Sequence, residues 1–146
     1  CTFNDEVTFN HVAQNINVLK RMKPNDYQPS SCTALYDAIG ITMLKLQEII
    51  QPDDQVFLAI FTDGLENASK NYTAKDIRHK LKKAEKDGWE VKFFCRYEDS
   101  HHYQKDLDLS PDLQFCLSLN EDGMKAMENQ VLYSLGKMIN PKKNKQ

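Results

Sequence analysis

Apolar residues recur along this chain with two different spacings, and segments of the two kinds alternate. Spacings of three and four residues predict a helix over residues 34–51, with its apolar face formed by Leu35, Ile39, Met43, Leu46 and Ile50. The uncharged run at 56–62 is bounded by turn residues and predicts a strand covered on both faces. The same reasoning predicts a helix over 73–87, a strand over 89–95, a short helix over 100–107, a strand over 114–118 and a helix over 121–139.

Residues at the ends of these segments support the boundaries. Thr73 and Asp76 resemble a capping box at the start of the second helix, and Gly88 supplies its stop. Pro52 ends the first helix. Upstream, residues 2–12 and 16–22 are predicted to be two extended segments that pair as a hairpin, and 23–32, rich in Pro and Ser, a loop.

This order of elements predicts an open α/β fold. A hairpin followed by alternating helices and strands is typical of a mostly parallel sheet flanked by helices. The 146 residues are enough for one domain with its own core, which we place at 1–139. Residues 140–146, "NPKKNKQ", are polar and basic, and we expect a disordered tail there.

Composition narrows the classes of function. Hydrophobic residues make up 40% of the chain and charged residues 27%, as in ordinary globular proteins. The formal net charge of −2 argues against a dedicated nucleic-acid binder and against attraction to anionic membranes. Basic residues of 75–86 alternate with acidic ones, which indicates a solvated helix face. No apolar run approaches the roughly 20 residues that span a bilayer.

The cysteines favour a reducing, cytoplasmic location. Cys1, Cys32, Cys95 and Cys116 form no C-x-x-C pair, and the last two lie in apolar runs, where reduced, buried thiols are expected. Their even number leaves a disulfide open. Zinc binding with the adjacent His101 and His102 is less favoured than a solvated loop, since neighbouring histidines rarely both point inward. Because Cys1 leads straight into a strand-like run, we expect the sequence to be cut from a longer chain.

Two oxygen-bearing side chains are placed to meet at one edge of the predicted sheet. Asp63 follows the strand at 56–62, and ligands of open α/β sheets bind at the carboxyl ends of strands. Thr33 precedes the helix at 34–51. Each has a simpler explanation, Asp63-Gly64 as a turn and Thr33 as an N-cap. Together, a hydroxyl and a carboxylate are oxygen ligands that Mg²⁺ takes, with water completing the shell.

The strings "CTALYDAIG" and "VFLAIFTDGLENAS" resemble the von Willebrand factor A-type (vWA) domain, with its "G-x-T-x-L-x-D-A" and strand-"T-D-G" patterns. "FNDEV" also resembles the second strand of that family, and the likeness is clear over residues 2–95. The resemblance implies a metal-ion-dependent adhesion site that binds Mg²⁺ and engages a carboxylate of a partner protein. It assigns Thr33 and Asp63 as metal ligands, the latter acting through water.

The chain departs from that pattern at its start. The family's first motif, D-x-S-x-S, and the central strand before it are absent, and Asp108-Leu109-Ser110-Pro111-Asp112 lacks the last serine and lies too late. Three explanations of the absent central strand remain open: it was cut away, it is supplied by another chain, or it was lost together with metal binding. A sheet without its middle strand leaves unpaired edges. With Thr33 and Asp63 alone, we expect weak Mg²⁺ binding.

We therefore predict a protein–protein interaction module, modulated by Mg²⁺ when the strand is supplied. Its expected partner is a protein with an acidic side chain that completes the metal shell, and a strand-swapped oligomer is a further possibility. Nucleic acid and membrane are not expected partners. One alternative is phosphotransfer on Asp63, which lacks a suitable second acid because position 65 is Leu65 and Glu66 is a poor substitute. The other alternative is a metal-free scaffold.

Overall fold

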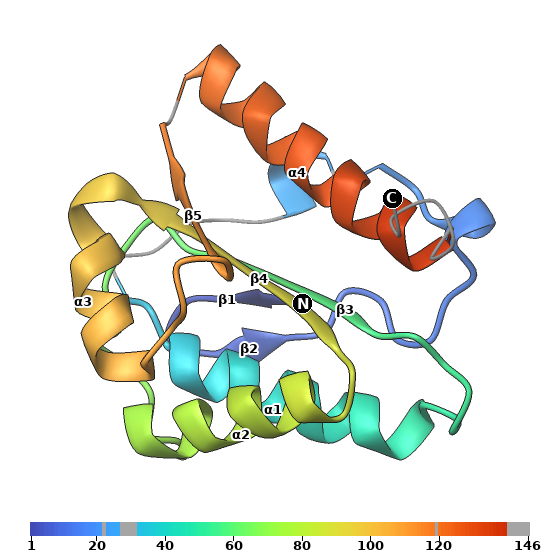
Figure 1. Ribbon diagram of the computed structural model, residues 1–146, viewed down its shortest axis with the longest axis horizontal. Helices are drawn as coiled ribbons and strands as arrows, with labels where there is room; N and C mark the ends of the chain where they lie inside the picture. The colour runs from blue at the N-terminus through green and yellow to red at the C-terminus, as the bar shows by residue number, and fades with distance from the viewer. Residues whose placement is uncertain (22, 27–31, 119, 140–146) are drawn as a thin grey trace, which may run out of the picture.

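The computed structural model describes residues 1–21, 23–26, 32–118 and 120–139. It shows an α/β fold with a parallel sheet flanked by helices and a separate N-terminal hairpin, as the sequence predicts (Figure 1). The elements are β1 (Thr2–Phe3), β2 (Val7–Thr8), the 3-10 helices η1 (Ile16–Val18) and η2 (Pro24–Asp26), α1 (Leu35–Ile49), β3 (Phe57–Phe61), α2 (Ala74–Lys86), β4 (Glu90–Arg96), α3 (Tyr97–Leu107), β5 (Gln114–Leu117) and α4 (Glu121–Ile139).

The main sheet has three parallel strands in the order β3-β4-β5. Its register aligns Ile60 with Phe93 and Cys95 with Cys116. Helices α1 and α2 lie on one side of the sheet, and α4 lies on the other (Figure 1). Parallel neighbouring strands have to be joined by a crossover connection, which is normally right-handed. Helix α2 joins β3 to β4, and helix α3 joins β4 to β5.

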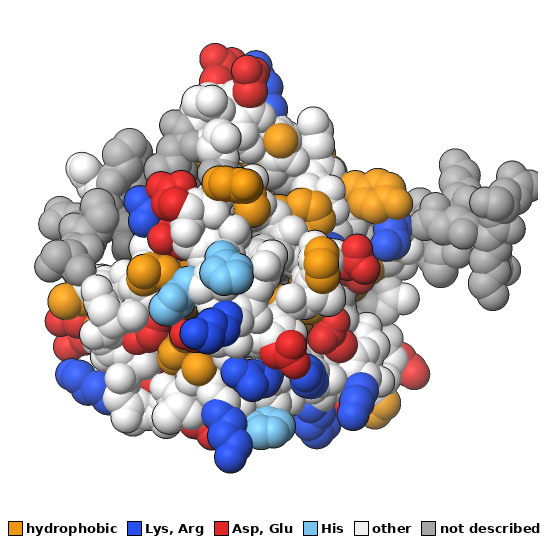
Figure 2. Space-filling view, turned by 60° about the vertical axis from the view of Figure 1, so that its left-hand side comes forward, with side chains coloured by type: hydrophobic (Ala, Val, Ile, Leu, Met, Phe, Trp, Pro, Cys, Tyr) orange, Lys and Arg blue, Asp and Glu red, His pale blue; other side chains and the backbone are white. Residues whose placement is uncertain are grey.

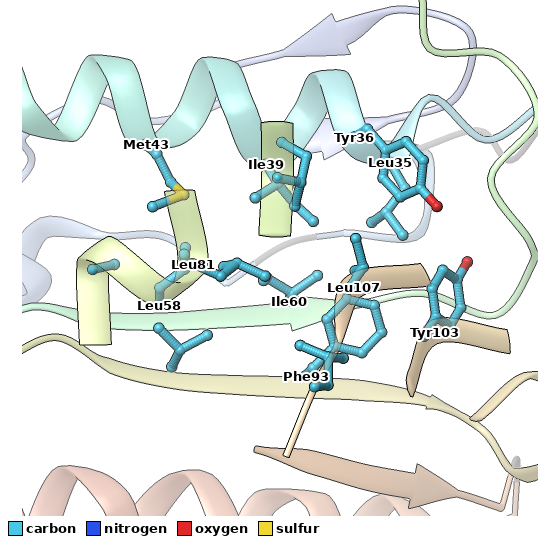
Figure 3. Close-up of a cluster of buried hydrophobic side chains, with 14 of the residues drawn as sticks. Leu35, Tyr36, Ile39, Met43, Leu58, Ile60, Leu81, Phe93, Tyr103 and Leu107 are labelled. Carbon is cyan, nitrogen blue, oxygen red and sulfur yellow. The ribbon is translucent and has the colours of Figure 1, made fainter. Parts of the chain in front are cut away.

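The core lies between α1, α2, α3 and one face of the sheet. Leu58 and Ile60 point from β3 towards α1, and Phe93 of β4 lies beside them (Figure 3). Fully burying a side chain of this size stabilises the fold by roughly 1.5–3 kcal/mol relative to leaving it exposed. The helices contribute Leu35, Tyr36, Ile39, Met43, Ile77, Leu81, Ala84, Tyr103 and Leu107.

The helix boundaries follow the capping chemistry. Thr73 accepts a hydrogen bond from the Asp76 backbone N–H, and Asp76 accepts one from the Thr73 backbone N–H, so the predicted capping box is confirmed. Gly88 has φ of +86°, a conformation that L side chains rarely adopt, which confirms it as the stop after α2. Helix α3 begins at Tyr97, three residues before the predicted start at 100.

Two expectations are wrong. The hairpin forms within the first predicted segment, where Thr2 pairs with Thr8 and Phe3 with Val7. The Asn4 side chain accepts a hydrogen bond from the Glu6 backbone N–H, which closes a turn early. Residues 16–18 are a 3-10 helix, capped by the Asn15 side chain, rather than a second arm of that hairpin. Residue 22, residues 27–31 of the predicted loop and the tail at 140–146 lie outside the described residues.

A further expectation is wrong: Cys116 is exposed, whereas Cys95 is buried as expected. The reason is its position on β5, a short strand at the edge of the sheet. All four cysteines are free thiols. Within the described ranges, no helix has the length and apolar character needed to cross a membrane.

The second face of the sheet carries a row of stacked aromatic rings. The ring centroids of Phe61 and Phe94 lie 4.6 Å apart, and those of Phe94 and Phe115 lie 5.5 Å apart. Helix α4 packs on β5 at one end of this row. Phe61, at the other end, remains 42% exposed. The β3 side of the sheet is therefore only partly covered.

The packing of α1 against the segment before α2 gives a first test. A Cβ atom at Gly40 would lie 2.5–2.6 Å from three ring carbons of Tyr72, whereas one at Gly136 in α4 would meet nothing within 4 Å. We expect Gly40→Ala to destabilise the fold by about 1–3 kcal/mol through overpacking. Gly136→Ala, the matched control, should stabilise it by about 0.5–1 kcal/mol through helix propensity. Urea denaturation measures both, and a stabilising Gly40→Ala would contradict the close packing.

Candidate functional site

The turn after β3 is held by hydrogen bonds to its own residues and to neighbouring elements. Thr62 is buried, its backbone N–H donates to Phe94 O at 2.9 Å, and its hydroxyl donates to Gly64 O at 2.9 Å. The hydroxyl of Tyr103, fully buried in α3, donates to the same Gly64 carbonyl oxygen at 2.6 Å. Burial raises the pKa of Tyr103 well above its usual value, so this hydroxyl keeps its proton. Between these anchors, the Asp63 side chain is exposed.

The loop after this turn caps the N-terminus of α1. Glu66 Oε2 accepts a hydrogen bond from the Tyr36 backbone N–H, and Ser69 Oγ accepts one from the Asp37 backbone N–H, both at 2.9 Å. The backbone N–H of Ala34 donates to Asn4 O of the hairpin. Three of the N–H groups that a helix start leaves without helical partners are thus satisfied by other segments. The loop, the hairpin and α1 are thereby joined at one point.

The loop caps α1, and α1 in turn binds the loop through the side chain of Asp37. Its carboxylate, only 5% exposed, accepts hydrogen bonds from the backbone N–H groups of Lys70, Asn71 and Tyr72 and from the Asn71 side-chain amide, at 2.8–2.9 Å. Burial alone would raise the pKa of Asp37, but these hydrogen bonds favour the charged form and hold the pKa below its usual value. The carboxylate also lies in the first turn of α1, where the helix dipole favours negative charge.

Thr33 lies where the sequence predicts, but it does not cap α1. The N-cap is Ala34, with no side-chain cap, so the simpler explanation of Thr33 as an N-cap is wrong. Instead, Thr33 and Asn67 are joined by two hydrogen bonds, from Thr33 N to Asn67 Oδ1 and from Asn67 N to Thr33 O. This pairing brings Thr33 Oγ1 to 3.4 Å from the position of a Cβ at Gly64. The hydroxyl of Thr33 therefore lies beside the turn that carries Asp63.

Two oxygens alone make an incomplete magnesium shell. The described residues contain no cluster of three or more His, Cys, Asp or Glu side chains that could hold a metal ion. His101 and His102, the candidates for zinc, therefore form no such cluster with the cysteines. Near Asp63, the guanidinium of Arg96 is bound by Asp99, from Nε to Oδ2 at 2.8 Å. That hydrogen bond, with the charges of Asp99, Glu98 and Asp63, holds the pKa of Arg96 above its usual value.

The second acid that phosphotransfer requires is already engaged. Glu66 Oε1 accepts from the backbone N–H groups of Ala68 and Ser69, and Oε2 accepts from Tyr36 and from the Ser69 hydroxyl. Both oxygens therefore serve the loop. Leu65, which precedes Glu66, is an exposed apolar residue with no proton to transfer.

A groove of about 410 Å³ runs along the open edge of β3. We call it the β3 groove. It is lined by the whole of β3, from Phe57 to Phe61, and by Cys1 and Phe3 at the hairpin. Helix α1 contributes Ala38, Ile39, Thr42 and Leu46 to the lining. None of its lining side chains carries a formal charge, so it offers a largely apolar channel beside the edge of β3 that no other described strand pairs with.

The surface over α2 carries charges of both signs. Figure 2 shows Lys and Arg side chains interspersed with Asp and Glu over this part of the molecule. Lys82 is paired with Asp108, and Lys83 with Asp87. Arg78 donates to the Asp106 carbonyl oxygen at 2.6 Å. These three basic residues of α2 thus bind acidic groups or carbonyl oxygens of the same chain.

Sequence reasoning missed the residues that hold the site together. Asp37 lies inside the string that carries the resemblance, and Glu66 and Ser69 lie in a polar stretch after the strand, but apolar spacing points to none of them. A usable signal was present: "ENAS" follows a strand end, and an acid in the first turn of a helix has backbone N–H groups within reach. Tyr103 gave no signal, since its partner is a backbone carbonyl far away in sequence.

Comparison with models of protein families, with curated proteins and with solved structures finds no match to this chain.

The Asp37 hydrogen bonds give a prediction with a defined pH dependence. Asp37→Asn leaves buried N–H groups facing a weaker acceptor, and we expect it to lower the free energy of unfolding by about 3 kcal/mol near neutral pH. Because the folded pKa is depressed, the stabilisation is fully present above the unfolded pKa of about 3.9. It is lost as the pH falls through the folded value.

Urea denaturation of both proteins from about pH 7 down to about pH 3 measures this difference. The gap between them should be constant at higher pH and shrink below about pH 4. Asp53→Asn, in the exposed turn after α1, is the control and should change little. A gap that stays constant down to the lowest pH would contradict the proposed role of the charge.

Proposed function

We propose that this domain is a protein-interaction module that receives an extended, apolar strand of a partner protein in the β3 groove. The observation that carries the proposal is the outer edge of β3, which pairs with no other strand among the described residues and is bordered by that groove. Addition of a strand to an exposed sheet edge is a recurrent mode of peptide recognition, in which main-chain hydrogen bonds supply affinity.

Hydrogen bonding identifies which groups are available to that strand. Val56 O accepts from Glu90 N, and Thr62 N donates to Phe94 O, so even-numbered positions of this strand face β4. Because backbone groups alternate along a strand, those of Phe57, Ala59 and Phe61 face the open edge. The three N–H groups and three C=O groups of these residues are spaced as hydrogen bonding to one further strand requires.

The edge also lacks the features that usually prevent pairing. Natural edge strands carry charges, prolines or bulges, or are covered by other elements. The β3 segment, "FLAIF", has neither charge nor proline, and a groove rather than a covering element lies beside it. An apolar strand of partner polypeptide would convert this exposed edge into an interior position of the sheet.

The neutral lining defines the chemistry of the partner. A charged side chain in the middle of the strand would be desolvated in the β3 groove without an opposite charge to pair with, which is costly. Two parts of the sequence outside the described ranges, 27–31 and 140–146, do not fit: the first contains a proline and serines, and the second contains three lysines and a proline. A strand rich in Val, Ile and Phe from a partner protein fits best.

The proposed magnesium site lies at the end of the added partner strand. A strand added parallel to β3 would end at the same edge as Asp63, beside the Thr33 hydroxyl. A carboxylate at that end of the partner would add the ligand that this chain lacks, with water completing the octahedron. The charge of Arg96 nearby opposes a cation held by Asp63 alone, which supports weak binding before the partner arrives.

Strand addition is tested with a labelled seven-residue peptide of alternating Val and Ile with terminal lysines. Ala59→Pro removes an outward N–H without removing a bond to β4, so we expect peptide affinity to fall at least tenfold, about 1.4 kcal/mol. Ala59→Val, the matched control, keeps the N–H and should bind like the unmodified chain. Fluorescence anisotropy measures the affinities, and circular dichroism verifies that both variants are folded.

Hydrogen exchange adds a residue-level readout of the same event. The amide protons of Phe57, Ala59 and Phe61 should exchange quickly in the free chain and become protected by the peptide. Equal binding by Ala59→Pro, or unchanged exchange at these amides, would overturn strand addition. If the chain does not bind the labelled peptide at all, the scaffold alternative holds.

The magnesium prediction compares two peptides that differ only in their last residue, Asp or Asn. Millimolar Mg²⁺ should strengthen binding of the Asp-ended peptide about tenfold relative to EDTA and leave the Asn-ended peptide unchanged. Asp63→Ala and Thr33→Ala should abolish that gain, and Asp53→Ala should retain it. An undiminished gain in Asp63→Ala would exclude this site while leaving strand addition intact.

A further inference from the structure

Two cysteines occupy directly opposed positions on neighbouring strands. Cys95 of β4 and Cys116 of β5 are register partners in the parallel ladder. Adjacent strands lie about 4.8 Å apart, and disulfides join residues whose Cα atoms are roughly 4.4–6.8 Å apart. The backbone spacing at this pair is therefore compatible with a disulfide, although both thiols are free in this structure.

The two side chains also share one face of the sheet. Gln114, two residues before Cys116, donates from Nε2 to Cys95 Sγ at 3.2 Å, so its side chain lies on the Cys95 side. Side chains alternate along a strand, which places Cys116 on the same face as Gln114. The Cys116 charge also contributes to the raised pKa of Cys95, behind burial as the main cause.

Their exposures differ in a way that suits stepwise oxidation. Cys95 is fully buried, whereas Cys116 is exposed near the end of β5. Reagents in solution can therefore reach Cys116 first. Strand β5 has four residues and, among the described strands, pairs with β4 alone, so it has few pairing bonds to restrain a small adjustment.

We propose that Cys95 and Cys116 form a reversible redox site, a dithiol that oxidises to a disulfide across β4 and β5. This site is separate from the β3 groove and does not depend on the proposed function. The remaining cysteines, Cys1 and Cys32, are exposed and are not sheet partners of either residue.

Oxidation by a small disulfide such as glutathione disulfide proceeds by two exchanges. The Cys116 thiolate attacks one sulfur of glutathione disulfide, which forms a mixed disulfide and releases one glutathione thiolate. The Cys95 thiolate then attacks Cys116 Sγ, which forms the internal disulfide and releases the second thiolate. The protons lost by the two cysteines protonate the two released thiolates. One dithiol is thus oxidised as one glutathione disulfide is reduced. The buried, raised-pKa thiol of Cys95 makes the second exchange the slower one.

The disulfide would enclose α3 in a covalent loop, since residues 97–107 lie between the two cysteines. Helix α3 carries Tyr103, whose hydroxyl holds the Gly64 carbonyl in the turn after β3. Oxidation would therefore fix the element that supports this turn. Closing a loop of this length should raise the unfolding midpoint by roughly 10 °C.

The test uses the full chain in a Cys1→Ser, Cys32→Ser background, which leaves only the two cysteines of interest. The reduced protein is treated with glutathione disulfide, and intact mass and peptide mapping follow the products. We expect a transient glutathione adduct and then a product lighter by two hydrogens, in which Cys95 and Cys116 are linked. Dithiothreitol should restore the starting mass and the lower unfolding midpoint.

A third substitution in this background, Cys116→Ser, is a conservative change at an exposed position and should fold, resist glutathione and show no shift in midpoint. Two outcomes would overturn the proposal. One is a glutathione adduct on Cys116 that persists without internal exchange. The other is a dithiol that stays reduced under glutathione disulfide while denatured protein of the same sequence is oxidised.

Discussion

The buried carboxylate of Asp37 is the constraint on which the arrangement of this molecule depends. It sits in the first turn of α1 and accepts four hydrogen bonds from residues 70–72, which connect the turn after β3 to α2. A carboxylate that is almost fully buried stabilises a fold only when its acceptor sites are occupied, and here the loop occupies them. The loop in return caps α1 through Glu66 and Ser69, so each segment satisfies polar groups that the other leaves open.

These reciprocal hydrogen bonds position the residues around the carboxyl end of β3, which we call the rim. Asn67 lies in the same loop and binds the backbone of Thr33 on both sides, which brings the Thr33 hydroxyl next to Gly64. Tyr103 holds Gly64 from α3. Two separate supports therefore fix the turn, while the Asp63 side chain between them is exposed. A rigid backbone that presents an exposed carboxylate is suited to recognition, since little order has to be gained when a ligand binds.

Periodicity identified the helices and the three strands of the sheet because each buries an apolar face of regular spacing, as Ile39 and Met43 do in α1. It failed where short polar side chains decide the backbone. Asn4 closes the hairpin early and Asn15 caps a 3-10 helix, and neither choice leaves an apolar pattern. Thr33 and Asp63 were brought to one edge as the sequence predicts. Their supports could not be predicted, because Asp37, Glu66 and Tyr103 act on backbone groups about 30 to 40 positions away.

The β3 groove and the rim favour different parts of one partner. The side chains that line the β3 groove carry no formal charge, and the outward backbone groups of β3 are matched by a complementary backbone with apolar side chains. At the carboxyl end of β3, this neutral surface gives way to the charges of Asp63 and Arg96 and the hydroxyl of Thr33. An all-apolar strand would leave these groups to water, and a charged strand would be desolvated in the β3 groove. A strand with an apolar body and a polar or acidic end satisfies both surfaces, so affinity would come from the edge and selectivity from the rim.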